Sequence, residues 1–281
     1  PSPANTSFVG LDLYRHALGV DASRPAEPRD PAVWRILGSR PNDPKFWLSL
    51  ENSLVFTLLW VPLGLTAAIA ISVSLFPSWL GMRWIRAIVF APYALGGVAA
   101  IMIWSWLLNP EFGAVNGMLR RLPFGFEPPE WLFSPQWCKP AVVWIHLWSV
   151  GGAAMVFLAA RRRVQPSLYE AARLDGAGAW RSFSSVTWPA ITPVVLFWTL
   201  TSVVFSMQAF NESFLLRNRR QGDGLLFYAV HLYQSAFDPP YRLGYACALA
   251  CILALSLALV AGLLLLTART WVHYGDEHAV R

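Results

Sequence analysis

Five long stretches without a charged side chain constrain the fold of this chain more than any other feature. Each is at least 21 residues long, and a helix rising 1.5 Å per residue needs about 20 residues to cross a hydrocarbon layer about 30 Å thick. The stretches are Asn52 to Met82, Ala87 to Pro110, Pro140 to Ala160, Ser182 to Asn211 and Leu243 to Ala268. A soluble protein of 281 residues could not cover five helices that lack a polar face. The pattern therefore predicts an all-α membrane protein, a bundle of about five transmembrane helices.

The charged residues between the stretches divide the chain into membrane and extramembrane parts. Residues 1–50 contain seven prolines and side chains of both charge signs, which predicts a polar extracytoplasmic segment. Residues 51–268 form the predicted transmembrane domain, with a cytoplasmic loop at 161–189 and a cytoplasmic tail at 269–281. The spans are expected at about 52–76, 84–108, 140–160, 190–211 and 244–268. The number of basic residues per unit length, though not their total number, favours an orientation in which the loop at 161–189 and the tail are cytoplasmic.

Composition excludes several classes of function. The net charge of +6 suggests nucleic-acid binding only if the basic residues share one face, and here they alternate with uncharged stretches, so we expect membrane lipid and no nucleic acid. The five histidines form no i, i+4 pair and the three cysteines are scattered, so we expect no metal and no cofactor. The chain has no phosphate-binding G-x-x-x-x-G-K-[ST] loop and should not hydrolyse ATP. The five uncharged stretches contain no Asp, Glu or Lys that could act in catalysis inside the membrane. We therefore expect no catalytic residue, and a membrane enzyme or scaffold is only a minor alternative.

The loop between the third and fourth spans has a local structure that the sequence predicts in detail. Ser167 followed by Glu170 is a capping box that predicts a short helix over 167–174. Gly176 then allows a left-handed turn, and a second short helix is expected over 179–186. Small side chains on this helix-turn-helix would let another protein approach closely; they belong to Ala171, Ala172, Ala177 and Ala179.

A longer motif overlaps these helices. It consists of Glu170, Ala171, Ala172, Asp175, Gly176, Ala177, Phe183 and Pro189. This order, E-A-A, two residues, D-G-A, then an aromatic residue and a proline, resembles the EAA loop of the permease subunits of binding-protein-dependent ABC importers. The stretches NSLVFTLLWVPLGL and FGAVNGML make the chain similar to the carbohydrate-uptake branch, the maltose and glycerol-phosphate type. The resemblance extends from about residue 8 to about residue 268.

The chain departs from that family at three places. Members of this subunit type usually carry one more helix before the position matching Phe8, so six spans are expected in the family and five here. The segment RNRRQGDG stands where a G-G-P-like turn is common, and Arg161 to Arg163 stand where small residues are usual.

The resemblance implies a multi-pass permease of the bacterial inner membrane. Its implied partners are a second permease subunit, a cytoplasmic dimer of ATP-binding subunits and an extracytoplasmic solute-binding protein. The solute would be a sugar, polyol or oligosaccharide, with another solute such as phosphate or an amino acid as the alternative. Coupling to the ATPase is assigned to Glu170, Ala171, Ala172, Asp175, Gly176 and Ala177. Glu170 and Asp175 could contact the ATPase directly or could only form the cap and the turn.

Six residues are candidates for the substrate pathway. They are Tyr93, Trp104, His146, Gln208, Asn211 and Glu212. Gln208 and Asn211 are three residues apart and would share a helix face, where their amides suit sugar hydroxyls. Alternatively, they cap the outer end of the helix.

His146 is an ionisable residue inside a predicted span, which suggests a functional role. Its alternative role is a hydrogen bond between helices. Pro62 and Pro92 lie inside the first two spans, where we expect kinks. Tyr93 follows Pro92 and would lie next to the kink of the second span.

Overall fold

The computed structural model describes residues 10–21, 40–121, 127–218 and 221–273. Parts of the predicted polar segment 1–50 and of the predicted tail 269–281 therefore lie outside the described residues, as does Phe8. The helices are α1 (Asp12–Leu18), α3 (Pro44–Ser74), α4 (Met82–Ala94), α5 (Gly97–Leu107), α6 (Ala114–Arg120), α7 (Cys138–Trp148), α8 (Gly151–Arg162), α9 (Pro166–Leu174), α10 (Ala179–Ser182), α11 (Trp188–Met207), α12 (Asn211–Leu216), α13 (Tyr228–Phe237) and α14 (Leu243–Trp271), with a π-helical turn η2 (Phe183–Thr187) between α10 and α11. Two short strands, β1 (Val20–Asp21) and β2 (Arg40–Pro41), pair antiparallel.

The described helices account for three to five membrane spans. Three segments are long and apolar enough to cross a membrane: α3, the segment Ala179–Leu216 that contains α10, η2, α11 and α12, and α14. Two further spans exist if each of two bent helix pairs is counted as one, α4 with α5 at 93° and α7 with α8 at 49°. The prediction of an all-α polytopic bundle is confirmed.

The range expected for the second span, 84–108, contains two helices at a steep angle. The break lies at Leu95 and Gly96, a few residues beyond Pro92, where the kink was expected. Gly96 has φ +77°, a conformation that glycine adopts without steric cost. By contrast, α3 passes through Pro62 as one helix of 31 residues. It begins at Pro44, before the expected 52, because Asp43 caps it by accepting hydrogen bonds from the amides of Lys45 and Phe46.

Two glycines allow α8 to pack tightly against α4. A Cβ on Gly151 would lie 2.0 Å from the carbonyl oxygen of Val89, and a Cβ on Gly152 would lie 2.6 Å from the ring of Tyr93. Only a residue without a side chain fits at these approaches, so the start of α8 brings Tyr93 close to the rest of the bundle.

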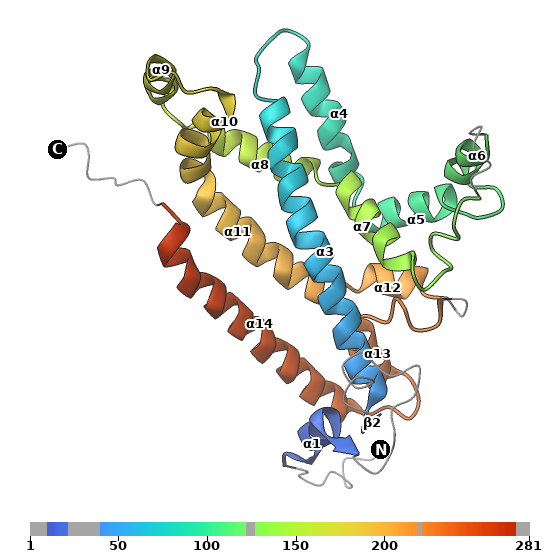
Figure 1. Ribbon diagram of the computed structural model, residues 1–281. Helices are drawn as coiled ribbons and strands as arrows, with labels where there is room; N and C mark the ends of the chain where they lie inside the picture. The colour runs from blue at the N-terminus through green and yellow to red at the C-terminus, as the bar shows by residue number, and fades with distance from the viewer. Residues whose placement is uncertain (1–9, 22–39, 122–126, 219–220, 274–281) are drawn as a thin grey trace.

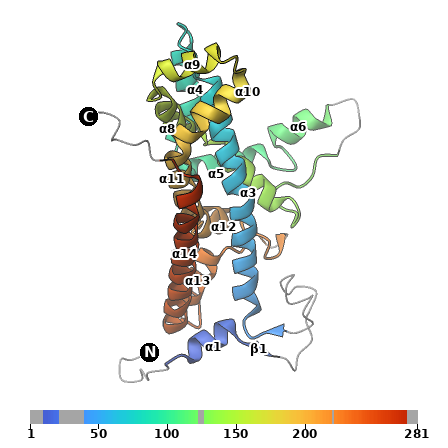
Figure 2. The same cartoon turned by 60° about the vertical axis from the view of Figure 1, so that its left-hand side comes forward.

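The long helices run side by side with a polar or loop-rich region at each end. Figure 1 shows α9 and α10 at one end of the bundle and α1 and α13 at the other, and Figure 2 confirms this separation from a second direction. The central core lies between α3, α5 and α7, around Phe56, Ile101 and Val142. In contrast, only 11% of the most apolar 18-residue stretch of α14 is buried inside the protein. A surface so apolar is stable only against lipid or against another membrane subunit.

Candidate translocation cavity and coupling segment

A cavity of about 890 Å³ brings together five of the six candidate pathway residues. These are Tyr93, His146, Gln208, Asn211 and Glu212. They come from α4, α7, the end of α11 and the start of α12, so residues far apart in sequence meet in one place. Aromatic rings form much of the remaining wall, from Phe56, Trp60, Phe90, Trp198, Phe205 and Phe210.

His146 and Glu212 face each other at this cavity. The His146 Nε2 atom lies 2.9 Å from Oε1 of Glu212, and the Glu212 residue is 8% exposed. The imidazole also lies between aromatic rings, 5.4 Å from the ring centroid of Phe56 and 5.1 Å from that of Trp60. His146 and Glu212 thus form an interhelical contact at the cavity wall, but the Nε2 atom has no hydrogen bond among the described residues, so the hydrogen bond between helices that was the alternative role of His146 is not found. Nothing in the sequence indicates that these two residues are partners.

Gln208 and Asn211 do not share a helix face, and that prediction is wrong. Helix α11 ends at Met207 and α12 begins at Asn211, so the two amides lie on either side of a break. Both side chains are exposed and both line the cavity. The break presents them to the cavity without the helical spacing on which the prediction rested.

Trp104 lies outside the lining of the cavity, in contrast to its prediction. It sits on α5, where its ring packs edge-on against Trp144 and Trp148 at 6.4 and 5.8 Å. Its Nε1 is buried and has no hydrogen-bond partner among the described residues. The steep bend after α4 directs α5 away from the cavity, which a straight second span would not have done.

Sequence reasoning missed the hydroxyl groups of α11. Thr201, Ser202 and Ser206 line the cavity together with Trp198 and Phe205. Trp198, the pair Thr201 and Ser202, and the pair Phe205 and Ser206 recur at intervals of three to four residues, which places them along one face of the helix. Hydroxyl residues recurring at this spacing inside an apolar stretch were the signal that could have identified this face.

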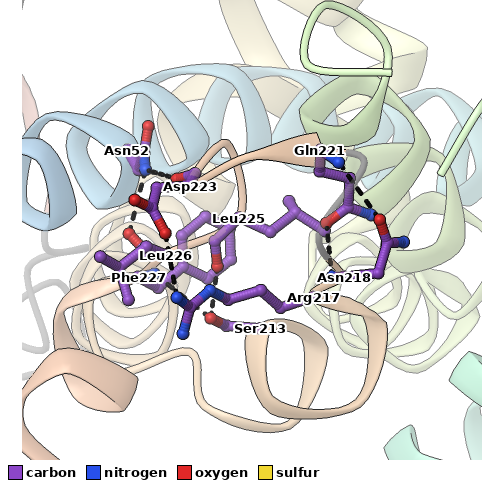
Figure 3. Close-up of polar contacts among 9 residues, drawn as sticks. All are labelled: Asn52, Ser213, Arg217, Asn218, Gln221, Asp223, Leu225, Leu226 and Phe227. Carbon is purple, nitrogen blue, oxygen red and sulfur yellow. Dashed lines mark hydrogen bonds and ion pairs between the residues drawn. The ribbon is translucent and has the colours of Figure 1, made fainter. Parts of the chain in front are cut away.

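The loop after α12 holds this part of the cavity wall in place (Figure 3). Asn52 of α3 donates hydrogen bonds to the carbonyl oxygens of Asp223 and Leu226, at 2.8 and 3.0 Å. Ser213 of α12 donates to the carbonyl oxygen of Leu225 and accepts from the amide of Phe227. Since these bonds are buried, they fix α12, and with it Glu212, against α3.

Polar side chains continue this network through the segment that departs from the family pattern. Arg217 and Asp223 form an ion pair at 2.9 Å, and Gln221 donates to the carbonyl oxygens of Leu132 and Leu216. The segment thus connects α12 to the chain before α7.

The loop at 161–189 is named the coupling segment here, after the role that the family resemblance implies for it. Its turn forms as predicted, but its cap does not. Helix α9 starts at Pro166 with Gln165 at the N-cap and no side-chain cap, so Ser167 is inside the helix and the predicted capping box is wrong. Proline is favoured at the first helical position because its fixed φ suits the helix and its missing N–H is not needed there. At the other end Gly176 has φ +75°.

Two hydrogen bonds close this turn. The amide of Ala177 donates to the carbonyl oxygen of Ala172 at 2.9 Å, and the amide of Gly176 donates to that of Arg173 at 3.0 Å. This pair of bonds is the Schellman motif, which satisfies the last carbonyl groups of a helix.

The second short helix expected over 179–186 is instead the beginning of the next span. Helix α10 passes through η2 directly into α11. Pro189 lacks an N–H and cannot continue the α-helical bonding to the preceding turn, and a local π-helical adjustment is one way in which membrane helices pair the backbone groups that a proline leaves free. Tyr169 of α9 and Thr187 of η2 join their hydroxyls at 2.9 Å, so the coupling segment is tied to this span.

The tip of the segment is exposed and partly apolar. No residue of α9 is buried, and Leu174 and Trp180 are 90% and 79% exposed. Glu170, Ala171, Asp175 and Gly176 are exposed, and Ala172 and Ala177 are half-buried. Large exposed apolar side chains beside small ones are typical of a protein contact surface.

Comparison with known proteins relates this arrangement to a family. Residues 60–271 match the family described as binding-protein-dependent transport system inner membrane component. The lactose transport system permease protein LacF of Rhizobium radiobacter is 30% identical over 235 residues, covering 81% of this chain and 78% of that protein. The sulfoquinovosyl glycerol transport system permease protein SmoG of Agrobacterium fabrum is 31% identical, covering 82% and 74%.

A solved structure shares the fold. A chain in the crystal structure of a bacterial alginate ABC transporter, in complex with an alginate pentasaccharide-bound periplasmic protein, aligns with a TM-score of 0.75 at 21% identity and covers 83% of this chain and 82% of that one. Taken together, the match over residues 60–271 and the shared fold establish that this chain belongs to the inner membrane components of binding-protein-dependent transport systems, as a multi-pass ABC transporter permease.

Proposed function

We propose that this permease imports a sugar and that the 890 Å³ cavity lines one side of the sugar's path, and we name it the translocation cavity for this proposed role. The observation that carries the proposal is the convergence of five pathway candidates on this cavity. The names of the relatives supply the substrate class, since LacF and SmoG are named for lactose and sulfoquinovosyl glycerol transport.

The chemistry of the lining suits a carbohydrate. Sugars present hydroxyl groups and apolar C–H faces, and a hydroxyl stripped of water without a partner costs about 1–3 kcal/mol. Amides at Gln208 and Asn211 and hydroxyls at Thr201 offer donors and acceptors. Exposed rings at Tyr93 and Phe205, which are 57% and 76% exposed, offer surfaces for the C–H faces.

Charge disfavours the alternative substrates. Among the lining residues the charged or chargeable groups are Tyr93, His146 and Glu212, with neither lysine nor arginine. A phosphate ion would meet a carboxylate and no permanent cation, and the carboxylate of an amino acid would likewise find neither lysine nor arginine to pair with. A neutral solute fits this half of the path.

We also propose the partners and the orientation. The exposed surface around Glu170, Ala171, Ala172, Asp175, Gly176 and Ala177 would dock on a cytoplasmic dimer of ATP-binding subunits, which hydrolyse ATP in place of this chain. The end with α1 and α13 would then face the extracytoplasmic solute-binding protein. The exposed apolar faces would contact lipid and a second permease.

The test uses the assembled importer in vesicles, with sugar uptake and ATPase activity measured together. Gln208→Ala and Asn211→Ala should each lower uptake at least severalfold while the ATPase activity stimulated by the binding protein changes little. Thr66→Ala is the control, because Thr66 is an exposed residue of α3 outside the cavity lining. Unchanged uptake in both amide variants would remove the cavity from the path, and uptake of phosphate or an amino acid with no sugar uptake would overturn the substrate class.

A further inference from the structure

A second cavity, of about 690 Å³, lies between the end of α3, the end of α8 and the coupling segment. It shares no lining residue with the translocation cavity. Arg161, Arg162 and Arg173 contribute three guanidinium groups to its lining, and Glu170 contributes the one carboxylate. The excess of positive charge indicates an anionic ligand.

Arg161 is buried at this cavity and only partly satisfied. It is 8% exposed, its Nη1 donates to the carbonyl oxygen of Ser72 at 3.2 Å, and its guanidinium carbon lies 4.4 Å from the ring centroid of Phe76. Its Nε is buried without a hydrogen-bond partner among the described residues. A guanidinium group has five N–H donors, and leaving a buried one unpaired is costly.

We infer that this cavity binds a phosphate group, carried by a phospholipid headgroup or as free phosphate. Guanidinium groups match phosphate oxygens with paired hydrogen bonds. A phosphodiester carries one negative charge and a free phosphate between one and two at neutral pH, so either would offset part of the excess of two guanidinium groups over carboxylates in the lining. The place is suitable, since α3 and α8 both end there and phospholipid headgroups lie at the ends of membrane spans.

Occupancy of this site would affect the coupling segment. Arg161 and Arg162 belong to α8, and Arg173 belongs to α9. A phosphate group between them would join the spans to the helix that carries the coupling residues. It would therefore restrict how α9 moves relative to α8.

The test measures binding to the assembled, delipidated importer in two arms. In the first arm, short-chain phosphatidylglycerol is titrated and bound lipid is counted by native mass spectrometry, with phosphatidylcholine as the comparison lipid. In the second arm, inorganic phosphate is titrated without lipid and the shift in unfolding temperature is recorded. Arg162→Gln and Arg173→Gln remove exposed lining arginines, and Arg163→Gln is the matched control, because Arg163 makes the same charge change outside the lining.

The expected result is a loss of about tenfold in affinity for Arg162→Gln and for Arg173→Gln, as removal of a charge-assisted hydrogen bond predicts, with Arg163→Gln unchanged. A loss in the lipid arm alone identifies a headgroup as the source, and a loss in the phosphate arm alone identifies free phosphate. Equal binding by all variants in both arms overturns the site, and so does an equal loss in Arg163→Gln, which would reflect charge without a built site. Because neither readout involves sugar, failure here leaves the proposed transport function untouched.

Discussion

The His146 imidazole and the Glu212 carboxylate lie 2.9 Å apart, although their helices are separated in sequence by α8, the coupling segment and α11. This contact joins α7 to α12 at the wall of the translocation cavity. Buried ionisable pairs within a membrane are costly unless they are well paired, and they are typical of functional sites.

Glu212→Ala should lower the free energy of unfolding by about 1–3 kcal/mol, because the His146 imidazole loses its buried partner. Glu212→Gln keeps an acceptor and should cost about 1 kcal/mol or less. Thermal unfolding in detergent measures both, and Glu111→Ala, at an exposed position, is the control. Equal stability of Glu212→Ala and the control would show that the contact contributes nothing.

Gly176→Val should abolish coupling, so that uptake is lost while ATP hydrolysis is uncoupled or the subunits fail to assemble. The cause is the backbone, since a Cβ at Gly176 meets nothing within 4 Å but φ is +75°, which strains a β-branched residue by about 1–3 kcal/mol. Gly178→Ala is a matched control, because its φ is −68° and its Cβ also meets nothing. Normal uptake at normal protein levels in Gly176→Val would refute the coupling assignment.

Gly151→Ala should prevent α8 from packing on α4 and reduce stability by about 1–3 kcal/mol, because its Cβ would overlap the carbonyl oxygen of Val89. Gly117→Ala provides the comparison, as a Cβ there meets nothing within 4 Å. A lower unfolding temperature in Gly151→Ala alone would show that the close approach of α8 to α4 is the cause. An equal decrease in both variants would instead show a general effect of replacing glycine.

Tyr93→Ala should reduce sugar uptake severalfold because it removes an exposed ring from the cavity wall. Trp104→Phe should leave uptake nearly unchanged, since Trp104 packs on Trp144 and Trp148 outside the lining. Uptake assays in vesicles compare the two, and a greater loss in Trp104→Phe would place the path along α5 instead.

Acid should destabilise the end of the bundle near α1 through Asp43. Burial raises the pKa of the Asp43 carboxyl, but the His231 imidazole at 3.4 Å and the Tyr245 hydroxyl at 2.5 Å outweigh burial and hold the pKa well below its usual range. A carboxyl with a lowered folded-state pKa contributes stability above its usual pKa of about 4, and that stability is lost as the pH falls further.

Asp43→Asn should therefore flatten the acid limb of the stability profile and cost about 1–2 kcal/mol at neutral pH, through the weakened cap and the lost contacts. Asp12→Asn should change neither, because the contact that Asp12 makes among the described residues is an exposed ion pair with Arg15 at 3.6 Å. Unfolding measured from pH 3 to pH 7 separates the variants, and an unchanged acid limb in Asp43→Asn would assign the acid sensitivity to other groups.

The features that depend on local chemistry could be predicted from the sequence. Charge-free stretches of at least 21 residues predicted the helical membrane bundle, because every backbone polar group in lipid must be bonded within its own helix. The Asp175-Gly176 pair predicted the turn of the coupling segment, since a left-handed residue after a helix requires only its own backbone freedom. Local reasoning failed where two local signals competed: Pro166 starts α9 and thereby displaces the capping box expected at Ser167.

Which side chains are neighbours in space depends on how the helices pack. The steep bend after Pro92 removes Trp104 from the cavity, and the break after Met207 presents Gln208 and Asn211 to it. The contact between His146 and Glu212 joins α7 to α12. Arg161 likewise reaches the end of α3 through a contact between residues 89 positions apart. Such contacts depend on the angles at which helices pack, and these angles depend on many side chains at once, so no short segment of the sequence contains them.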